Sequence, residues 1–324
     1  MQTPVIASAT DFRIPPRRYT MGYLFISIAL LCGVTKGFCG KKTSGNLVNT
    51  SDAMMVNTVR MLACIFIGFA IIAFQGEIYS LAASPKFILI AALSGIGTTV
   101  FTVSWLLSVK QGAYMMVDVF LLMGVVLPIT LSKFIYGESI ETIQWIGILL
   151  LIIAGYVMCS YNASIKGKLT PRALILLALC ALSNGVTDFS QKMFTKEIPE
   201  GNVAAFNLYT YLFAGITLAV CCLCFRFSEK KSTELQPPIK VIRPIVGYIA
   251  VMAVCLFLNS YFKTLAAQHL DAALIYPLSQ GGSVILSMAM SAIFFKEKIN
   301  LRCIIGVALS FVALLLINLL PLYV

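Results

Sequence analysis

Apolar runs of about 20 residues, each long enough to cross a bilayer as an α-helix, follow one another along almost the whole chain. Short polar turns separate them. The pattern predicts ten membrane-spanning helices, at residues 21–40, 53–74, 87–108, 112–136, 142–161, 171–194, 203–225, 245–267, 271–295 and 301–321. The chain is therefore predicted to be an all-α integral membrane protein.

One stretch of this pattern occurs twice. Residues Ser132–Ala154 (SKFIYGESIETIQWIGILLLIIA) return as Ser291–Ala313 (SAIFFKEKINLRCIIGVALSFVA), 159 positions later. Matches in the first two helices of each half extend the repeat: Gly33-Val34-Thr35 with Gly185-Val186-Thr187, and Asn57 with Asn207. An odd number of helices per repeat turns the second copy over, which predicts two inverted five-helix repeats around a site near the midplane.

The predicted organisation is a polar N-terminal tail (1–20), a first five-helix repeat (21–165) and a second five-helix repeat (166–324). An acidic turn precedes the fifth helix of each repeat, and that helix contains a glycine. These residues are Gly137-Glu138 with Gly147, and Lys296-Glu297 with Gly306.

In these features the chain resembles the drug/metabolite transporter superfamily, EamA type. The resemblance implies a secondary transporter with a central cavity between the halves and with peripheral fifth and tenth helices. Lys296 departs from the usual Gly-Glu turn, which leaves the expected fold unchanged.

Composition supports a membrane protein, with 59% hydrophobic and 11% charged residues. The net charge of +11 lies mainly in loops, where contact with anionic lipid explains it and nucleic acid does not. The 10 cysteines lie mostly in apolar runs, where cysteine acts as a small hydrophobe. We expect no disulfide framework, no metal site and no cofactor, and the absence of a P-loop excludes transport driven by ATP on this chain.

Polar residues inside the spans are the candidates for a solute site, because charge in a bilayer is costly and normally faces a cavity or a partner. The predicted substrate-binding residues are Lys36, Asn184, Asp188, Lys192, Asn259, Lys263, Tyr276 and Gln280. Asn184, Asp188 and Lys192 share one face of the sixth helix. An ion pair between Asp188 and Lys192 that only tightens packing is the alternative.

Asp118 and Asp188 are the candidates for carrying a coupling proton. Asp118 is the only acid deep in the fourth helix and needs a cationic partner, for which Lys263 and Lys36 are the candidates. The candidates hold more cations than acids, which favours an anionic or zwitterionic solute.

Three further expectations concern single features. Pro277 and Gly281-Gly282 are expected to interrupt the ninth helix. Arg60, near the start of the second helix, is either part of the polar site or a lipid-facing residue that snorkels to the membrane surface. Glu138 and Glu297 are predicted to lie on opposite membrane faces, which excludes joint catalysis and leaves each to favour the N-terminus of the helix that follows it.

The predicted function is secondary transport of a small polar metabolite, such as an amino acid or organic anion, across the plasma membrane by alternating access. Coupling to protons is open. A non-transporting scaffold or sensor is the alternative, and an intramembrane enzyme is a weaker one because the chain has no compact catalytic motif.

Loop charges put both termini outside, whereas relatives resembling this chain have them in the cytoplasm, so sidedness stays open. A homodimer through Gly147 and Gly155, or around Gly306, also stays open, because small residues pack helices within one chain as well.

Overall fold

The computed structural model describes residues 17–47, 50–110, 114–166, 171–229, 243–295 and 301–318. The N-terminal tail up to residue 16 and the turn 296–300, with Glu297, lie outside them. The described helices are α1 (Arg17–Ser44), α2 (Thr50–Gln75), the 3-10 turn η1 (Ile78–Leu81), α3 (Pro85–Lys110), α4 (Tyr114–Gly124), α5 (Val126–Tyr136), α6 (Thr142–Lys166), α7 (Pro171–Glu197), α8 (Val203–Glu229), α9 (Arg243–His269), α10 (Ala272–Phe295) and α11 (Leu301–Asn318).

The described part of the chain contains helices and no strands. Seven of these helices are long and apolar enough to cross a membrane, and three shorter apolar segments accompany them. The prediction of an all-α, multi-pass membrane protein is confirmed at this level. The count of ten spans and the inverted arrangement stay predictions.

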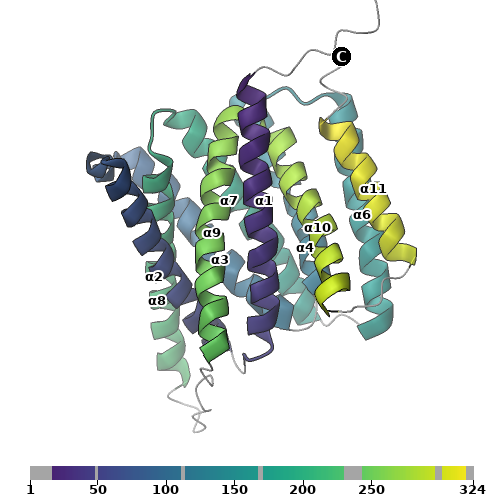
Figure 1. The fold of residues 1–324 in the computed structure, drawn as a ribbon, viewed down its shortest axis with the longest axis horizontal. Helices are drawn as coiled ribbons and strands as arrows, with labels where there is room; N and C mark the ends of the chain where they lie inside the picture. The colour runs from purple at the N-terminus through teal and green to yellow at the C-terminus, as the bar shows by residue number, and fades with distance from the viewer. Residues whose placement is uncertain are drawn as a thin grey trace, which may run out of the picture.

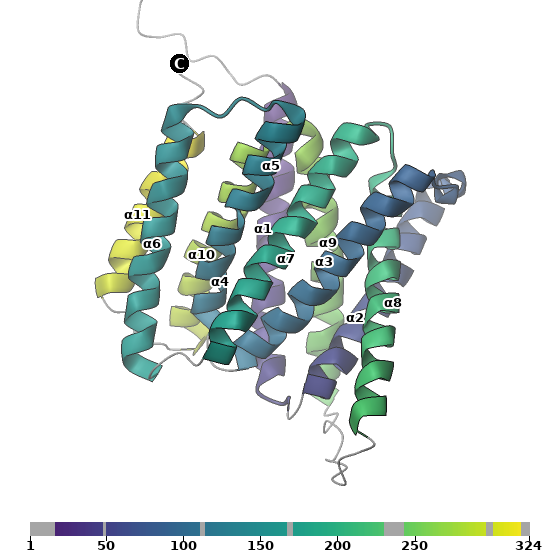
Figure 2. The same ribbon diagram turned by 180° about the vertical axis from the view of Figure 1, so that it is seen from behind.

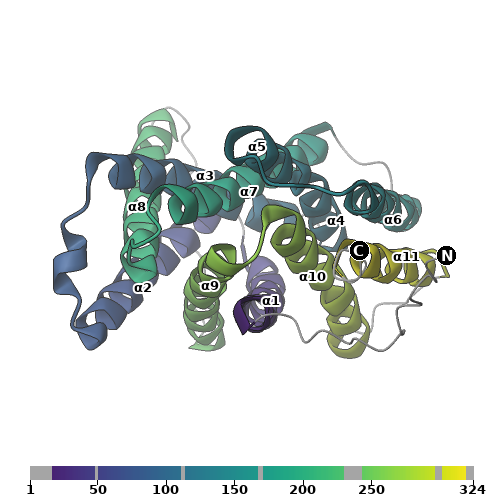
Figure 3. The same cartoon turned by 90° about the horizontal axis from the view of Figure 1, so that it is seen from above.

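The helices form two layers (Figures 1 and 2). One layer runs α2, α9, α1, α10 and α11, and the other runs α8, α3, α7, α4–α5 and α6, with contacts between successive members. Seen from above, α6 and α11 lie together at one edge and α2 and α8 at the other (Figure 3). Each layer mixes helices from both halves of the sequence, so any space between the layers is lined by both halves.

The predicted span 112–136 is divided between α4 and α5 at Gly124 and Val125. Pro128 explains the break, because it has no N–H to donate to the carbonyl of Gly124. At the same break, the Val125 N–H donates to the carbonyl of Leu122, three residues earlier and 3.2 Å away. A Cβ on Gly124 would lie 2.4 Å from the Ala181 carbonyl oxygen, so this glycine brings α4 against α7.

The ninth predicted span is one unbroken helix, α10, with Pro277 inside it. The expected interruption is therefore wrong. Pro277 lies little more than one turn from the start of α10 and leaves only the Ala273 carbonyl without its helical donor. Gly281 and Gly282 permit close packing, since a Cβ would lie 2.9 Å from Leu314 of α11 and 2.3 Å from Leu30 of α1, respectively.

Gly137 ends α5 in the left-handed conformation (φ 65°), which glycine adopts without steric cost. The chain then turns through Glu138 into α6. Gly147 of α6 packs within the chain, because a Cβ there would lie 2.6 Å from Ile317 of α11. The homodimer stays a prediction.

Candidate functional site

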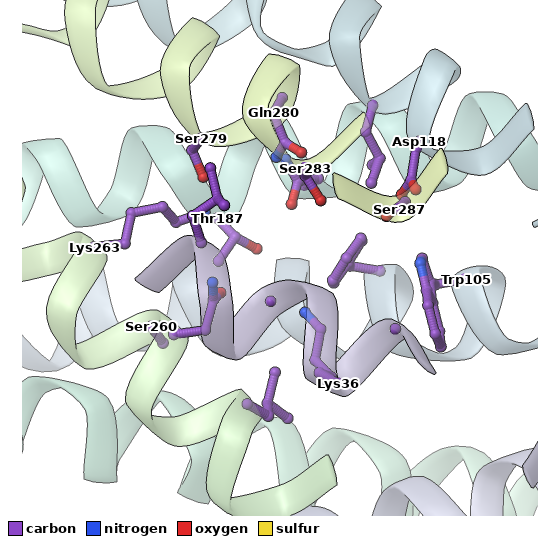
Figure 4. A pocket seen from close by; sticks show the side chains of 18 of the residues that line it. Lys36, Trp105, Asp118, Thr187, Ser260, Lys263, Ser279, Gln280, Ser283 and Ser287 are labelled. Atoms are coloured by element: carbon purple, nitrogen blue, oxygen red, sulfur yellow. The ribbon is translucent and has the colours of Figure 1, made fainter. Parts of the chain in front are cut away.

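A cavity of about 70 Å³ is lined by helices of both layers: α1, α9 and α10 from one, and α3, α4, α7 and α8 from the other. Most of its lining is polar (Figure 4). The polar and charged lining residues, apart from Trp105 and Tyr211, are Lys36, Asp118, Asn184, Thr187, Gln191, Asn259, Ser260, Lys263, Ser279, Gln280, Ser283 and Ser287. The volume holds a few water molecules, well below the ~300 Å³ and upward of pockets that enclose a ligand.

Five of the predicted binding residues line this cavity, namely Lys36, Asn184, Asn259, Lys263 and Gln280. Asp118 lines it as well. The other three do not belong to the lining: Asp188 and Tyr276 lie behind the wall, bonded to the helices that form it, and Lys192 lies further along α7.

Asp188 and Lys263 form an ion pair that joins α7 to α9. Asp188 is wholly buried, and its second oxygen accepts a hydrogen bond from Asn184 Nδ2 at 3.1 Å. The Tyr276 hydroxyl donates to the Asp188 backbone carbonyl at 2.6 Å, which adds α10 to the cluster. Both carboxylate oxygens are thus satisfied, as a buried charge requires. The alternative pairing of Asp188 with Lys192 is wrong.

Lys36 enters the cavity from α1 (Figure 4). Its ammonium lies 5.5 Å from the centroid of the Phe101 ring. No ion pair with an acid reaches it from the described residues. Gly33, one turn earlier, allows close approach of α9, because a Cβ there would lie 3.0 Å from Asn259 Nδ2. Asn259 Nδ2 in turn donates to the Ala29 carbonyl at 2.6 Å, so α1 and α9 hold each other in place.

Asp118 projects from α4 toward Ser287 of α10, whose side chain hydrogen-bonds to it (Figure 4). Its other oxygen, Oδ2, is buried without a hydrogen-bond partner in the described part of the protein. Neither expected partner, Lys36 or Lys263, forms an ion pair with it in the described structure. A buried carboxylate oxygen without a partner is costly, which makes Asp118 a position that favours a proton or a bound donor.

Lys192 pairs with Glu138 of the turn between α5 and α6, at 2.8 Å between Nζ and Oε1. Lys192 Nζ also donates to the Leu270 carbonyl at 2.8 Å, and it is only 1% exposed. The other oxygen of Glu138 accepts from the Ala272 N–H at 2.9 Å, at the first residue of α10. Glu138 therefore binds the N-terminus of α10, across the molecule, and not that of the following helix for which its role was predicted.

Burial alone would raise the pKa of Glu138, but the positive charge of Lys192, with hydrogen bonds from Lys192, Ala272 and Lys196, brings that pKa below its ordinary value. The carboxylate is accordingly charged at neutral pH. The resulting Glu138 cluster, defined as Glu138, Lys192, Lys196, Leu270 and Ala272, joins α7 to the turn before α6 and to the turn between α9 and α10.

Arg60 is only 1% exposed, so the lipid-facing alternative is wrong. Its Nη1 donates to Asn57 Oδ1 at 2.6 Å, while its Nε has no hydrogen-bond partner in the described structure. No acid of the described residues pairs with it. Its charge acts on Tyr211, which lines the cavity, and on Lys36.

Sequence reasoning placed Gln191 on the same face of the sixth helix as Asn184, but it did not single out Ser260, which belongs to the polar wall. Gln191 Nε2 donates to Ser260 Oγ at 2.9 Å, and Ser260 donates on to Asn207 Oδ1 at 2.5 Å. This chain joins α7, α9 and α8 beside the cavity. The match of Asn57 with Asn207 between the repeats was the available signal, because both asparagines are completely buried at equivalent places.

These features define a class: a helical, multi-pass membrane protein with a polar cavity enclosed by both halves of its chain. The model of the EamA-like transporter family matches residues 20–160 and again residues 171–319. The chain belongs to the EamA-like transporter family of the drug/metabolite transporter superfamily. The names of the family and of its relatives point to membrane transport.

Among curated proteins, an uncharacterized transporter of Archaeoglobus fulgidus is 26% identical over 195 residues, covering 60% of this chain and 62% of that protein. The chain thus matches less than two thirds of that relative's length. The quaternary ammonium compound-resistance protein QacG of Staphylococcus sp. is 27% identical over 110 residues, 34% of this chain and 92% of its own. QacC of Staphylococcus aureus is 28% identical over 110 residues, with the same coverage of both chains.

A solved structure titled only "Crystal structure of protein" superimposes with a TM-score of 0.72 at 14% identity, over 93% of this chain and 97% of the other. This likeness extends over nearly the whole of both chains. At this identity it establishes a common fold and nothing about the solute.

Proposed function

We propose that this protein is a secondary transporter that moves a small polar solute, such as an amino acid or an organic anion, across the plasma membrane by alternating access. The observation that carries the proposal is the polar cavity between the two layers. Polar and charged groups, which are costly to bury, converge there from five helices, although the protein is otherwise strongly apolar.

The proposed inverted repeat rests on two supports. The family model matches each half separately. In addition, helix contacts recur with the halves exchanged: α1 packs on α9 as α7 packs on α3, and α1 contacts α10 as α7 contacts α4. Two similar bundles facing one cavity is the arrangement in which rocking of one bundle against the other exposes the site to either side in turn.

The Glu138 cluster is the proposed closure at one end of the cavity. It lies one turn beyond the Asp188–Lys263 pair along α7, and it fastens the first half of the chain to the turn between α9 and α10. For the cavity to open at this end, these buried bonds have to separate. Solute release on that side is therefore proposed to include rupture of the Lys192–Glu138 pair.

Proton coupling is proposed through Asp118, because one of its oxygens lacks a partner within the cavity wall. Asp188 is the weaker candidate, since both of its oxygens are already bonded. A carboxyl that alternates between a buried and an opened environment can take up a proton on one side and release it on the other.

A second candidate function is export of quaternary ammonium compounds, which the names of QacG and QacC favour. The aromatic rings of Phe101 and Trp105 in the lining could contact such a cation. Lys36 and Lys263 in the same lining oppose it, because they repel a positive solute.

The proposal is tested by a thermal-shift screen of the purified protein against amino acids, carboxylates, sugar phosphates and quaternary ammonium compounds. A solute that binds the folded state raises Tm. We expect a hit that is lost in Ser283→Trp, which fills the cavity from α10, and kept in Ile293→Trp, an exposed position on the same helix. A hit that survives Ser283→Trp would place binding elsewhere and contradict the proposal.

A further inference from the structure

The charges in and around the cavity do not balance. Lys263 is neutralised by Asp188. Lys36 and Arg60 remain, and Asp118 is the one acid among the described residues that line the cavity. Around the cavity the described structure thus places three cations, Lys36, Arg60 and Lys263, against two acids, Asp118 and Asp188.

Neither remaining cation has an acidic partner in the described structure. Lys36 faces the cavity, where its ammonium lies over the Phe101 ring and feels the charge of Asp118 without forming an ion pair with it. Arg60 lies behind the wall, beside Tyr211, with a single side-chain bond to Asn57. An unpaired charge in a protein interior is costly, so such a pair of cations persists where a further anion compensates it.

The two cations also act on each other, because Arg60 repels the ammonium of Lys36. Arg60 cannot reach a solute directly, since it does not belong to the lining. Its effect is to hold the cavity at positive potential around Lys36, which lines the cavity and can touch the solute. The surrounding donors suit an acceptor-rich group, as Ser279, Ser283 and Gln280 line the same space.

We propose that the transported solute is a small monoanion whose carboxylate or phosphate group binds Lys36, with Arg60 setting the positive potential that selects it. With Asp118 ionised, one negative charge brings the charged groups around the cavity to neutrality, whereas a quaternary ammonium ion would raise the excess. This inference rests on the proposed transport function, since it names the solute class of the same cavity.

The experiment compares solutes of equal size that differ in charge. Lactate is tested against lactamide and acetate against acetamide, by thermal shift at millimolar concentration, with alanine and alaninamide as the zwitterionic and cationic comparisons. The expected result is a rise in Tm with the anionic member of a pair and none with its uncharged or cationic partner. Binding of alanine alone would show that a zwitterion is required, and binding of alaninamide or a quaternary ammonium compound would show a cation site; either result overturns the inference, as does the lack of a shift with any anion.

Variants assign the group. Lys36→Gln should lower anion affinity about 10- to 100-fold, the range for losing a hydrogen bond to a charged group, and Lys36→Arg should keep most of it. Arg60→Met, at a residue outside the cavity lining, should lower anion affinity by less, under about tenfold. Because Arg60 is buried, added salt should reduce this effect less than it would reduce the effect of a surface charge. If Lys36→Gln fails to fold, Lys36→Arg and Arg60→Met still decide the matter. Unchanged affinity in Arg60→Met would remove Arg60 from the inference.

Reconstituted vesicles separate failure of this inference from failure of the proposed function. Anion binding without flux of any bound solute would contradict transport and leave the anion site standing. Flux of a cation that Ser283→Trp abolishes would uphold transport and overturn the anion site.

Discussion

Removing the charge of Glu138 is expected to destabilise the protein more than removing any single exposed ion pair. In Glu138→Gln the buried Lys192 ammonium keeps its bonds to the Leu270 and Ala267 carbonyls, at 2.8 and 3.4 Å, but loses its counter-charge at 2.8 Å. Leaving one partner of a buried pair uncompensated costs about 3–5 kcal/mol. The remaining acid, Asp271, lies 4.0 Å away and is half-exposed, so it compensates little.

Lys196 supplies the matched control. It contacts the same oxygen of Glu138 at 3.1 Å but is 38% exposed. Solvent screens such a pair, and Lys196→Gln should cost under about 1 kcal/mol. Both variants therefore remove an ion pair of the same carboxylate. They differ mainly in the burial of the lysine, which is 1% exposed for Lys192 and 38% for Lys196.

The assay is thermal unfolding in detergent, followed by loss of monodisperse protein on size-exclusion chromatography. At about 2 °C per kcal/mol for a chain of this size, Glu138→Gln should lower Tm by roughly 6–10 °C and Lys196→Gln by about 2 °C or less. Equal shifts for the two variants would refute the reasoning, because the buried pair would then contribute no more than an exposed one.

The remaining predictions use the same assays. Because the pKa of Glu138 is lowered in the folded protein, its charge stabilises the fold above the unfolded pKa of about 4.3, and this stabilisation is lost as pH falls through the lower folded pKa. The Tm difference between wild type and Glu138→Gln should therefore be constant near neutrality and shrink below about pH 4. A Tm difference that persists in acid would contradict this. Asp118→Asn should flatten the pH dependence of solute flux if Asp118 carries the proton, whereas an unchanged profile would exclude it from coupling. Gly147→Val should force α6 away from Ile317 and lower Tm by several degrees, the result of overpacking by about 1–3 kcal/mol, and an unchanged Tm would show that α6 and α11 pack less closely than described.

Much of the fold could be predicted from the sequence because a helix that crosses a bilayer requires a long apolar run of residues. The break at Gly124 was not recognised, although Pro128 supplies its reason four residues later. The opposite error was made at Pro277, where a proline near a helix start removes a single bond and the helix continues.

The candidate site was predicted in part. Spacing along one helix correctly grouped Asn184 and Asp188, because residues four apart share a face. It could not tell Asp188 from Glu138 as the partner of Lys192, since that choice depends on how the turn before α6 meets α7, across 54 residues of sequence from 138 to 192. Arg60 was misjudged for the same reason: a helix position near a predicted membrane boundary does not show whether another helix covers it.

The most direct test of the central claim is solute counterflow in liposomes. Vesicles loaded with the unlabelled solute found by the thermal-shift screen are diluted into a trace of the labelled solute, and the internal label is followed. Alternating access at the cavity predicts a transient accumulation of label above equilibrium with wild type and Ile293→Trp, and none with Ser283→Trp. Binding of the solute without counterflow in wild-type vesicles, or counterflow that persists in Ser283→Trp, would contradict it.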